Sequence, residues 1–106
     1  MRLKKNRVFN PVCFSCQQCV EKYLKARLIE EGLDFPRTHD LLKLLHLLQP
    51  VEPLWLSYET VAEKMSQYAS NFRYPGENAT LADAKLALKN CKSLRAEVRR
   101  SLGLKK

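Results

Sequence analysis

Apolar residues recur along most of this chain at intervals of three and four positions, the spacing of one face of an α-helix. Glycine and proline interrupt the pattern at only a few places and divide it into four amphipathic segments. We predict helices over residues 11–31, 39–48, 54–72 and 81–102. No segment alternates apolar and polar residues convincingly, so no strand is predicted. The predicted fold class is all-α, an up-and-down bundle of four main helices, mostly antiparallel neighbours joined by short loops.

Residues that favour helix ends lie at the predicted boundaries. The dipeptide Asn10–Pro11 can begin the first helix, since asparagine caps well and proline fits the first turn. Gly32 follows the end of this helix. Thr38 can cap the second helix, and Thr80 and Asp83 have the spacing of a capping box before the fourth. The boundaries therefore agree with the periodicity.

Length and charge limit the possible partners. A chain of 106 residues is enough for one domain with its own core. We expect a helical domain over residues 10–103, preceded by a basic segment over residues 1–9. The chain has 19 basic and 11 acidic residues and a net charge of +8, which favours an anionic partner. Neither a secretion leader nor a membrane-spanning run is evident, so we expect a cytoplasmic protein and no membrane partner.

The first predicted helix has an apolar side and a polar side. The apolar side consists of Val12, Cys13, Cys16, Cys19, Val20, Tyr23, Leu24 and Leu28, and the polar side of Gln17, Gln18, Glu21, Lys22 and Lys25. Glu21 precedes Lys25 by four positions, the favourable order for an ion pair. The polar side is either a solvated surface with one ion pair or a binding surface, and spacing alone favours the solvated surface.

The cysteines and histidines do not predict a metal centre. The thiols of Cys13, Cys16 and Cys19 spread over about 120° of the apolar arc, so we interpret them as small buried residues rather than ligands of one ion. Four cysteines in a cytoplasmic protein favour free thiols over disulfides. His39 lies at a predicted helix start, where amide groups favour an anion, and its role is either functional or, at least as readily, one in capping or loop packing. His46 is expected to be a partly buried packing residue. We therefore expect no metal and no cofactor.

The fourth predicted helix carries a basic stripe. The stripe comprises Lys85, Lys89, Lys92, Arg95, Arg99 and Arg100, without an acid in it, and lies opposite Ala84, Ala87, Cys91, Leu94, Val98 and Leu102. Such a stripe can neutralise phosphates with little base specificity, although solvated helix faces are also often charged. No aromatic residue interrupts it, so a stacking platform for single strands is not indicated.

Three strings of the sequence resemble, in order and spacing, three blocks of the HEPN domain family. They are residues 16–26 (CQQCVEKYLKA), residues 35–41 (FPRTHDL) and residues 68–76 (YASNFRYPG), and the resemblance covers about residues 10–102. It implies a small helical domain tied to nucleotide and RNA biology. Family members generally have a longer first helix or a short helix before Asn10, whereas nine residues precede Asn10 here. The resemblance therefore implies either a misplaced gene start or a shortened first element.

The catalytic signature of HEPN ribonucleases is missing from the sequence. These enzymes use an arginine followed after four to six residues by a histidine, paired across a homodimer for metal-independent cleavage. The residues at that distance after Arg73 are Asn78, Ala79 and Thr80, and none of them is a histidine. Arg37 has no histidine at that distance either. We therefore do not expect RNA cleavage by that mechanism and favour a protein that is not an enzyme, with a divergent ribonuclease as the open alternative.

Two hypotheses about function remain. The favoured one is a non-catalytic HEPN protein that forms a homodimer and binds a nucleotide, a partner minimal nucleotidyltransferase, or both, in a toxin–antitoxin-like pair. Its binding residues, as the resemblance implies, are Gln17, Glu21, Lys22, Lys25, His39, Arg73 and Tyr74. The alternative is an RNA-binding protein or divergent metal-independent ribonuclease that uses the basic stripe, with His39 as acid or base and Arg73 beside the phosphate.

Overall fold

The chain folds into helices joined by short irregular segments. The computed structural model describes residues 2–71 and 80–103. Its elements are α1 (Arg2–Glu30), α2 (Leu41–Leu47), a 3-10 helix η1 (Pro53–Tyr58), α3 (Glu59–Asn71) and α4 (Leu81–Ser101). These residues include no strand. The predicted all-α bundle of four main helices is confirmed.

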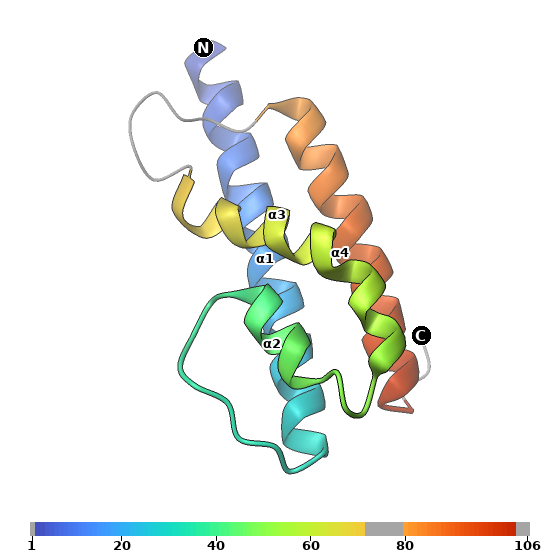
Figure 1. Ribbon diagram of the computed structural model, residues 1–106. Coiled ribbons are helices and arrows are strands. Elements are labelled where there is room, and N and C mark those ends of the chain that lie inside the picture. The colour runs from blue at the N-terminus through green and yellow to red at the C-terminus, as the bar shows by residue number, and fades with distance from the viewer. Residues whose placement is uncertain (1, 72–79, 104–106) are drawn as a thin grey trace.

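The longest helix, α1, forms the spine of the molecule, and α4 packs along it (Figure 1). Contacts between the two helices advance in step, from Tyr23 with Arg99 to Arg27 with Ser101, so α1 and α4 run in the same direction. Between them the chain returns through η1 and α3, which cross the spine in the opposite direction, while the short α2 packs against α1 and α3 (Figure 1). The first and last helices are thereby neighbours.

The start of α1 differs from the sequence prediction. We predicted that the first helix begins at Pro11 after an Asn10 cap, but α1 begins at Arg2 and includes Pro11. Proline has no N–H, so the carbonyl of Arg7 lacks one helical donor, yet a single missing bond does not end the helix. Phe9 packs against the core on the N-terminal side of the proline, which favours continuation. The first element is thus long, contrary to the shortened helix that we expected.

The end of α1 follows the prediction closely. Gly32 has a φ of 70°, a left-handed conformation that favours glycine. The amide of Gly32 donates to the carbonyl of Ile29 at 3.0 Å, and the amide of Leu33 donates to that of Leu28 at 2.9 Å. These bonds close the last turn and direct residues 31–40 back along α1.

The second helix begins two residues later than predicted. Asp40, rather than Thr38, is the cap, and its side chain accepts hydrogen bonds from the amides of Leu42 and Lys43. Thr38 instead accepts a hydrogen bond from the amide of Asp40 at 3.0 Å. The local polar groups therefore stabilise the turn before α2, and His39 lies outside the helix.

The third predicted helix, residues 54–72, consists of two elements. Pro53 opens η1 and α3 follows directly, while Phe72 lies outside the described residues. Trp55 of η1 is buried, and its indole Nε1 donates to Oε2 of Glu97 on α4 at 3.0 Å. The 3-10 turn therefore places a large aromatic ring between the helices.

The fourth helix begins as predicted. Thr80 and Asp83 form a reciprocal capping box, with bonds of 2.9 and 3.1 Å between each side chain and the other residue's amide. The helix then runs to Ser101. Its buried residues, Ala84, Ala87, Leu94 and Val98, belong to the face that the sequence assigned to the core.

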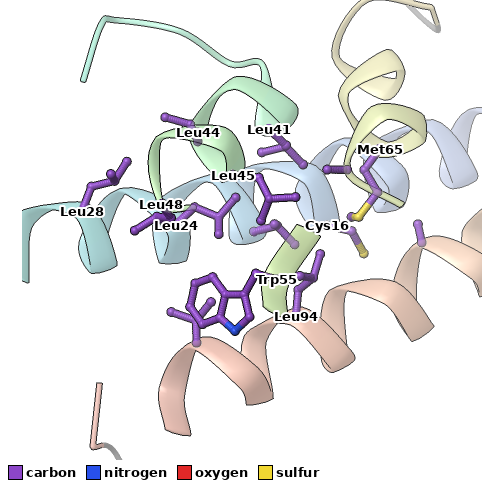
Figure 2. Packing of buried hydrophobic residues seen from close by; sticks show 14 of the residues in the cluster. Cys16, Leu24, Leu28, Leu41, Leu44, Leu45, Leu48, Trp55, Met65 and Leu94 are labelled. Carbon is purple, nitrogen blue, oxygen red and sulfur yellow. The ribbon is translucent and has the colours of Figure 1, made fainter. Parts of the chain in front are cut away.

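The core gathers where α2 meets α1, η1 and α4 (Figure 2). Its largest fully buried side chains include Leu24 and Leu28 of α1, Leu41, Leu44 and Leu45 of α2, Leu48, Met65 of α3 and Leu94 of α4. Each buried leucine contributes about 1.5 to 3 kcal/mol of transfer free energy. The seven residues of α2 therefore hold their position through packing rather than helix propensity.

A buried ionic cluster joins the ends of α1 and α4. Arg27 is 8% exposed and binds Glu31 at 2.7 Å, Glu52 at 3.1 Å and the hydroxyl of Ser101 at 2.7 Å. The Ser101 hydroxyl also donates to Glu52. The sequence analysis did not identify Arg27, although an arginine on the apolar arc of a helix was an available signal. The cluster fixes the C-terminal end of α1 against α4 and the turn before η1.

Candidate functional site

The polar side of α1 is not a solvated surface. Gln17 is fully buried and Glu21 is 5% exposed. The interpretation as a solvated side is therefore wrong for these two residues, because residues 31–40 and α2 pack over them. Lys22 is exposed, as expected of that side, whereas Lys25 is only half-buried. The segment that contains His39 thus covers Gln17 and Glu21 and buries this part of the polar side.

Gln17 connects α1 to the covering segment, and Gln18 supports it from within α1. The Nε2 group of Gln17 donates to the backbone carbonyl of His39 at 2.9 Å and lies 3.3 Å from Oε1 of Glu21. The Nε2 group of Gln18 donates to Oε1 of Gln17 at 2.8 Å and reaches Oε1 of Glu21 at 3.4 Å. Since buried polar groups need partners, these bonds allow an amide and a carboxylate to lie below the surface.

The Glu21 carboxylate lies at the centre of this arrangement. Its Oε2 accepts from Nζ of Lys25 at 2.9 Å, and Nδ1 of His39 lies 2.9 Å from Oε1 and 3.1 Å from Oε2. Burial alone raises the pKa of Glu21, but hydrogen bonds from Lys25, His39 and Gln17 and the charge of Lys25 together hold the pKa below its usual value. Glu21 is therefore an ionised carboxylate at neutral pH.

His39 differs from Glu21 in exposure. Its side chain is 71% exposed, whereas that of Glu21 is 6% exposed. Because Nδ1 faces a carboxylate, the neutral imidazole carries its proton on Nδ1 and leaves Nε2 as an acceptor. No described residue hydrogen-bonds to Nε2. The buried acid thus fixes the orientation of an imidazole whose other nitrogen is available to a ligand.

The N-terminus of α2 is not available to an anion beside His39. The Asp40 carboxylate already accepts the amides of Leu42 and Lys43. The amide of Leu41 donates to the hydroxyl of Ser66 on α3 at 2.8 Å. The expectation that these helix amides attract an anion is therefore wrong, because the side chains of Asp40 and Ser66 already accept their hydrogen bonds.

The remaining predicted binding residues do not all join this cluster. Lys22 lies on α1 next to Glu21 but forms no hydrogen bond or ion pair with His39, and Arg73 and Tyr74 lie outside the described residues. Proximity of Arg73 to His39 stays a prediction. Within the described residues the fold brings together Gln17, Glu21, Lys25 and His39. Gln18 also belongs to this cluster, although the sequence analysis did not include it among the binding residues.

The other histidine is not a packing residue. His46 is exposed rather than partly buried, and its Nε2 lies 2.5 Å from Oε2 of Glu59 on α3. The prediction failed because α2 buries Leu41, Leu44, Leu45 and Leu48 on one side, which leaves His46 outside that side. His46 is nonetheless useful as an exposed, carboxylate-paired histidine with which to compare His39.

The basic stripe of α4 divides into two groups. Lys85, Lys89, Lys92 and Arg95 are exposed, and no ion pair to another described residue is found for them. Arg99 is half-buried and donates to the hydroxyl of Tyr23 at 3.1 Å, and Arg100 pairs with Glu97 at 2.5 Å. The expected stripe without an acid is therefore shorter than predicted, because Glu97 neutralises its C-terminal end.

The cysteines are free thiols. Cys13 and Cys16 are buried, as predicted, while Cys19 is half-buried, and the fold brings the distant Cys91 next to Cys16 and Cys19. Burial raises the pKa of Cys13 to about 11, and burial with the neighbouring thiols raises the pKa of Cys91 to about 12. In the described part of the chain, no group of three or more histidine, cysteine, aspartate or glutamate residues could hold a metal ion.

These features define an all-helical protein in which a buried carboxylate orients an exposed imidazole beside a short leucine-rich helix. The chain belongs to the HEPN family, because the family model described as the HEPN domain matches residues 1–101. The resemblance read from the three strings is thereby confirmed. No curated protein and no solved structure matches the chain. Of the helices described, none has both the length and the apolar character needed to cross a membrane.

Proposed function

We propose that this protein is a non-catalytic HEPN domain that uses the surface around His39 to bind a nucleotide, a partner minimal nucleotidyltransferase, or both, in a toxin–antitoxin-like pair. The observation that carries the proposal is the contact between the buried Glu21 carboxylate and the exposed His39 imidazole. A homodimer and the partner itself are part of the proposal, with the family as their support. Arg73 and Tyr74 complete the proposed binding surface.

The buried cluster prepares His39 for binding. Lys25, Gln17 and Gln18 keep the Glu21 carboxylate in place, and the carboxylate holds Nδ1 of the imidazole. A ligand that meets a fixed side chain loses less conformational entropy than one that must order it. When protonated, His39 donates from Nε2 to a phosphate or carboxylate oxygen, and when neutral it accepts at the same atom.

Binding rather than catalysis is favoured by the sequence around the family's reactive position. Arg73 has no histidine after four to six residues, so the pair used by HEPN ribonucleases is missing. Lys25, the lysine of the described cluster, is already paired with the Glu21 carboxylate. An exposed imidazole with one available nitrogen then has the features of a recognition group.

The first test compares two exposed histidines. His39→Ala removes the group held by Glu21, and the matched control His46→Ala removes an exposed histidine paired with Glu59. Each protein is titrated calorimetrically with adenosine and guanosine nucleotides and with the nucleotidyltransferase encoded beside its gene. We expect His39→Ala to weaken binding about tenfold or more, equivalent to about 1.4 kcal/mol, and His46→Ala to leave it unchanged.

Two results would contradict the proposal. One is that the wild-type protein binds neither nucleotides nor a neighbouring nucleotidyltransferase, or that no such gene is present. The other is equal binding by the wild type and His39→Ala. Circular dichroism of both variants serves as the folding control, because a loss of helix would weaken binding for another reason.

The alternative, an RNA-binding protein or divergent metal-independent ribonuclease, rests on the same Glu21–His39 contact together with the exposed lysines of α4. A carboxylate that holds Nδ1 of a histidine is also the arrangement that orients a general base. The exposed lysines of α4 would then contact the RNA backbone. Cleavage of RNA in the presence of a chelator, lost in His39→Ala and in Arg73→Ala, would establish this alternative; cleavage that survives both changes would exclude it.

A further inference from the structure

One stripe of α4 combines exposed leucines with basic residues that form no ion pair with another described residue. Leu81 is 51% exposed and Leu88 is 45% exposed, and Lys85, Lys92 and Arg95 are exposed as well. At 100° per residue these five residues fall within about 80° of the helix circumference. We call them the leucine–lysine stripe. Leu81 and Leu88 lie seven positions apart on this stripe, about 10 Å along the helix axis, with Lys85 between them.

The spacing of the stripe is that of a helix-packing seam. Its residues follow one another at intervals of four, three, four and three positions, which is the repeat that keeps a seam along one side of a helix. The stripe extends about 21 Å, from the first turn of α4 to its fourth. Such a ridge presents alternating apolar and basic side chains to another helix lying along it.

The stripe is separate from the His39 surface. Tyr23 contacts Arg99 at the flank of α1 that faces α4, whereas Glu21 contacts His39. Tyr23 and Glu21 lie about 160° apart around α1, so the two surfaces are on different flanks of the spine. A partner on one does not require the other.

We propose that the leucine–lysine stripe docks an acidic amphipathic helix of a different protein. Glutamates or aspartates of that helix pair with Lys85, Lys92 and Arg95, and its apolar residues cover Leu81 and Leu88. Charge complementarity decides the occupant: a second copy of α4 would place like charges opposite one another, and a nucleic acid backbone offers no apolar surface to the leucines.

The test uses a synthetic acidic helix. A 21-residue fluorescent peptide of three heptads carries alternating leucine and glutamate at its seam positions, and a control peptide carries lysine in place of each glutamate. Fluorescence anisotropy is measured on the full chain. We expect the acidic peptide to bind, the lysine peptide to fail, and both Leu88→Asp and Lys92→Glu to weaken binding of the acidic peptide about tenfold or more. The matched control Lys43→Glu, on exposed α2 surface, should leave binding unchanged.

Charge exchange provides a readout that misfolding cannot imitate. The Lys92→Glu protein should gain affinity for the lysine peptide relative to the wild type. Parallel titrations use a 20-nucleotide uridine oligomer and vesicles of phosphatidylserine and phosphatidylcholine. Binding to the oligomer or vesicles that depends on Lys92 but not on Leu88 would overturn the proposal in favour of a phosphate-binding surface. Failure of the acidic peptide to bind, or indifference to Leu88→Asp, would also overturn it.

Discussion

The replacement Glu21→Gln gives the most direct test of the buried cluster. The amide keeps the size of the side chain but removes the charge, and it cannot accept hydrogen bonds from both Lys25 and His39 in the geometry of the carboxylate. Two charge-assisted contacts, at 2.9 Å each, are therefore weakened together. The perturbation is confined to the cluster because Gln17 retains its bond to the His39 carbonyl.

The expected loss of stability follows from the exposure of the partners. A hydrogen bond to a charged group contributes about 1.5 to 3 kcal/mol when it is sheltered from water. The side chains of Lys25 and His39 are 22% and 71% exposed, so water can hydrogen-bond to them in the variant and reduces the loss of stability. We expect a decrease of about 2 kcal/mol in the free energy of unfolding, which lowers Tm by about 10 °C for a domain of this size.

Urea and thermal unfolding followed by circular dichroism measure this decrease. The control is Glu30→Gln, an exposed acid on the same helix, for which we expect a change within about 0.5 kcal/mol. A Glu21→Gln protein as stable as this control would refute the conclusion that the carboxylate holds the covering segment to α1.

Acid titration supplies a second measurement on the same variant. The folded protein holds the pKa of Glu21 below its unfolded value, so its contribution to stability is present above the unfolded pKa and is lost as pH falls through the folded pKa. The wild type should therefore lose its advantage over Glu21→Gln as the pH falls from the unfolded pKa of glutamate, 4.5, through the lower folded pKa. An unchanged difference over this window would contradict the ionised state that we assign to Glu21.

Three further predictions concern other parts of the fold. Arg27→Ala leaves Glu52 without its buried partner and should lower the free energy of unfolding by about 2 to 4 kcal/mol in urea, whereas Arg100→Ala, on exposed surface, should leave it nearly unchanged; equal effects would refute a clamping role. Asp40→Ala removes the cap of α2 and should lower the free energy of unfolding by about 1 kcal/mol in the same assay. An unchanged free energy of unfolding would contradict a capping role for Asp40. At pH 8 the raised pKa values should make alkylation by iodoacetamide, located by mass spectrometry, about 100-fold slower at Cys13 and about 1000-fold slower at Cys91 than in guanidinium-unfolded protein; similar rates would contradict the raised pKa values.

Much of the fold could be predicted from local signals. The capping box of Thr80 and Asp83, the end of α1 at Gly32 and the apolar face of α4 depend on residues close in sequence, and the structure shows all three. Pro11 was misleading because proline is compatible with both a helix start and a helix interior that tolerates one missing bond.

The candidate site could be predicted only in part. The wheel placed Gln17 and Glu21 together, but their burial depends on residues 31–40, which fold back over α1 from a different part of the chain. The spacing of α1 gives one signal, because Gln17 lies seven and eleven positions before Leu24 and Leu28 and so shares their side of the helix. It does not indicate which segment covers Glu21. Likewise, the pairing of His39 with Glu21 joins residues 18 positions apart, beyond the reach of any helical repeat.

The parallel alignment of α1 and α4 has a consequence for how the chain reaches its native state. Tyr23 and Arg99 are 76 positions apart, and α4 supplies Leu94 and Val98 to the core. The helix synthesised first therefore finishes burying its apolar face only after the last helix has been made. Until then Cys13, Cys16 and Val20 lack part of their cover, so the nascent chain depends on rapid completion of α4 to avoid association through α1.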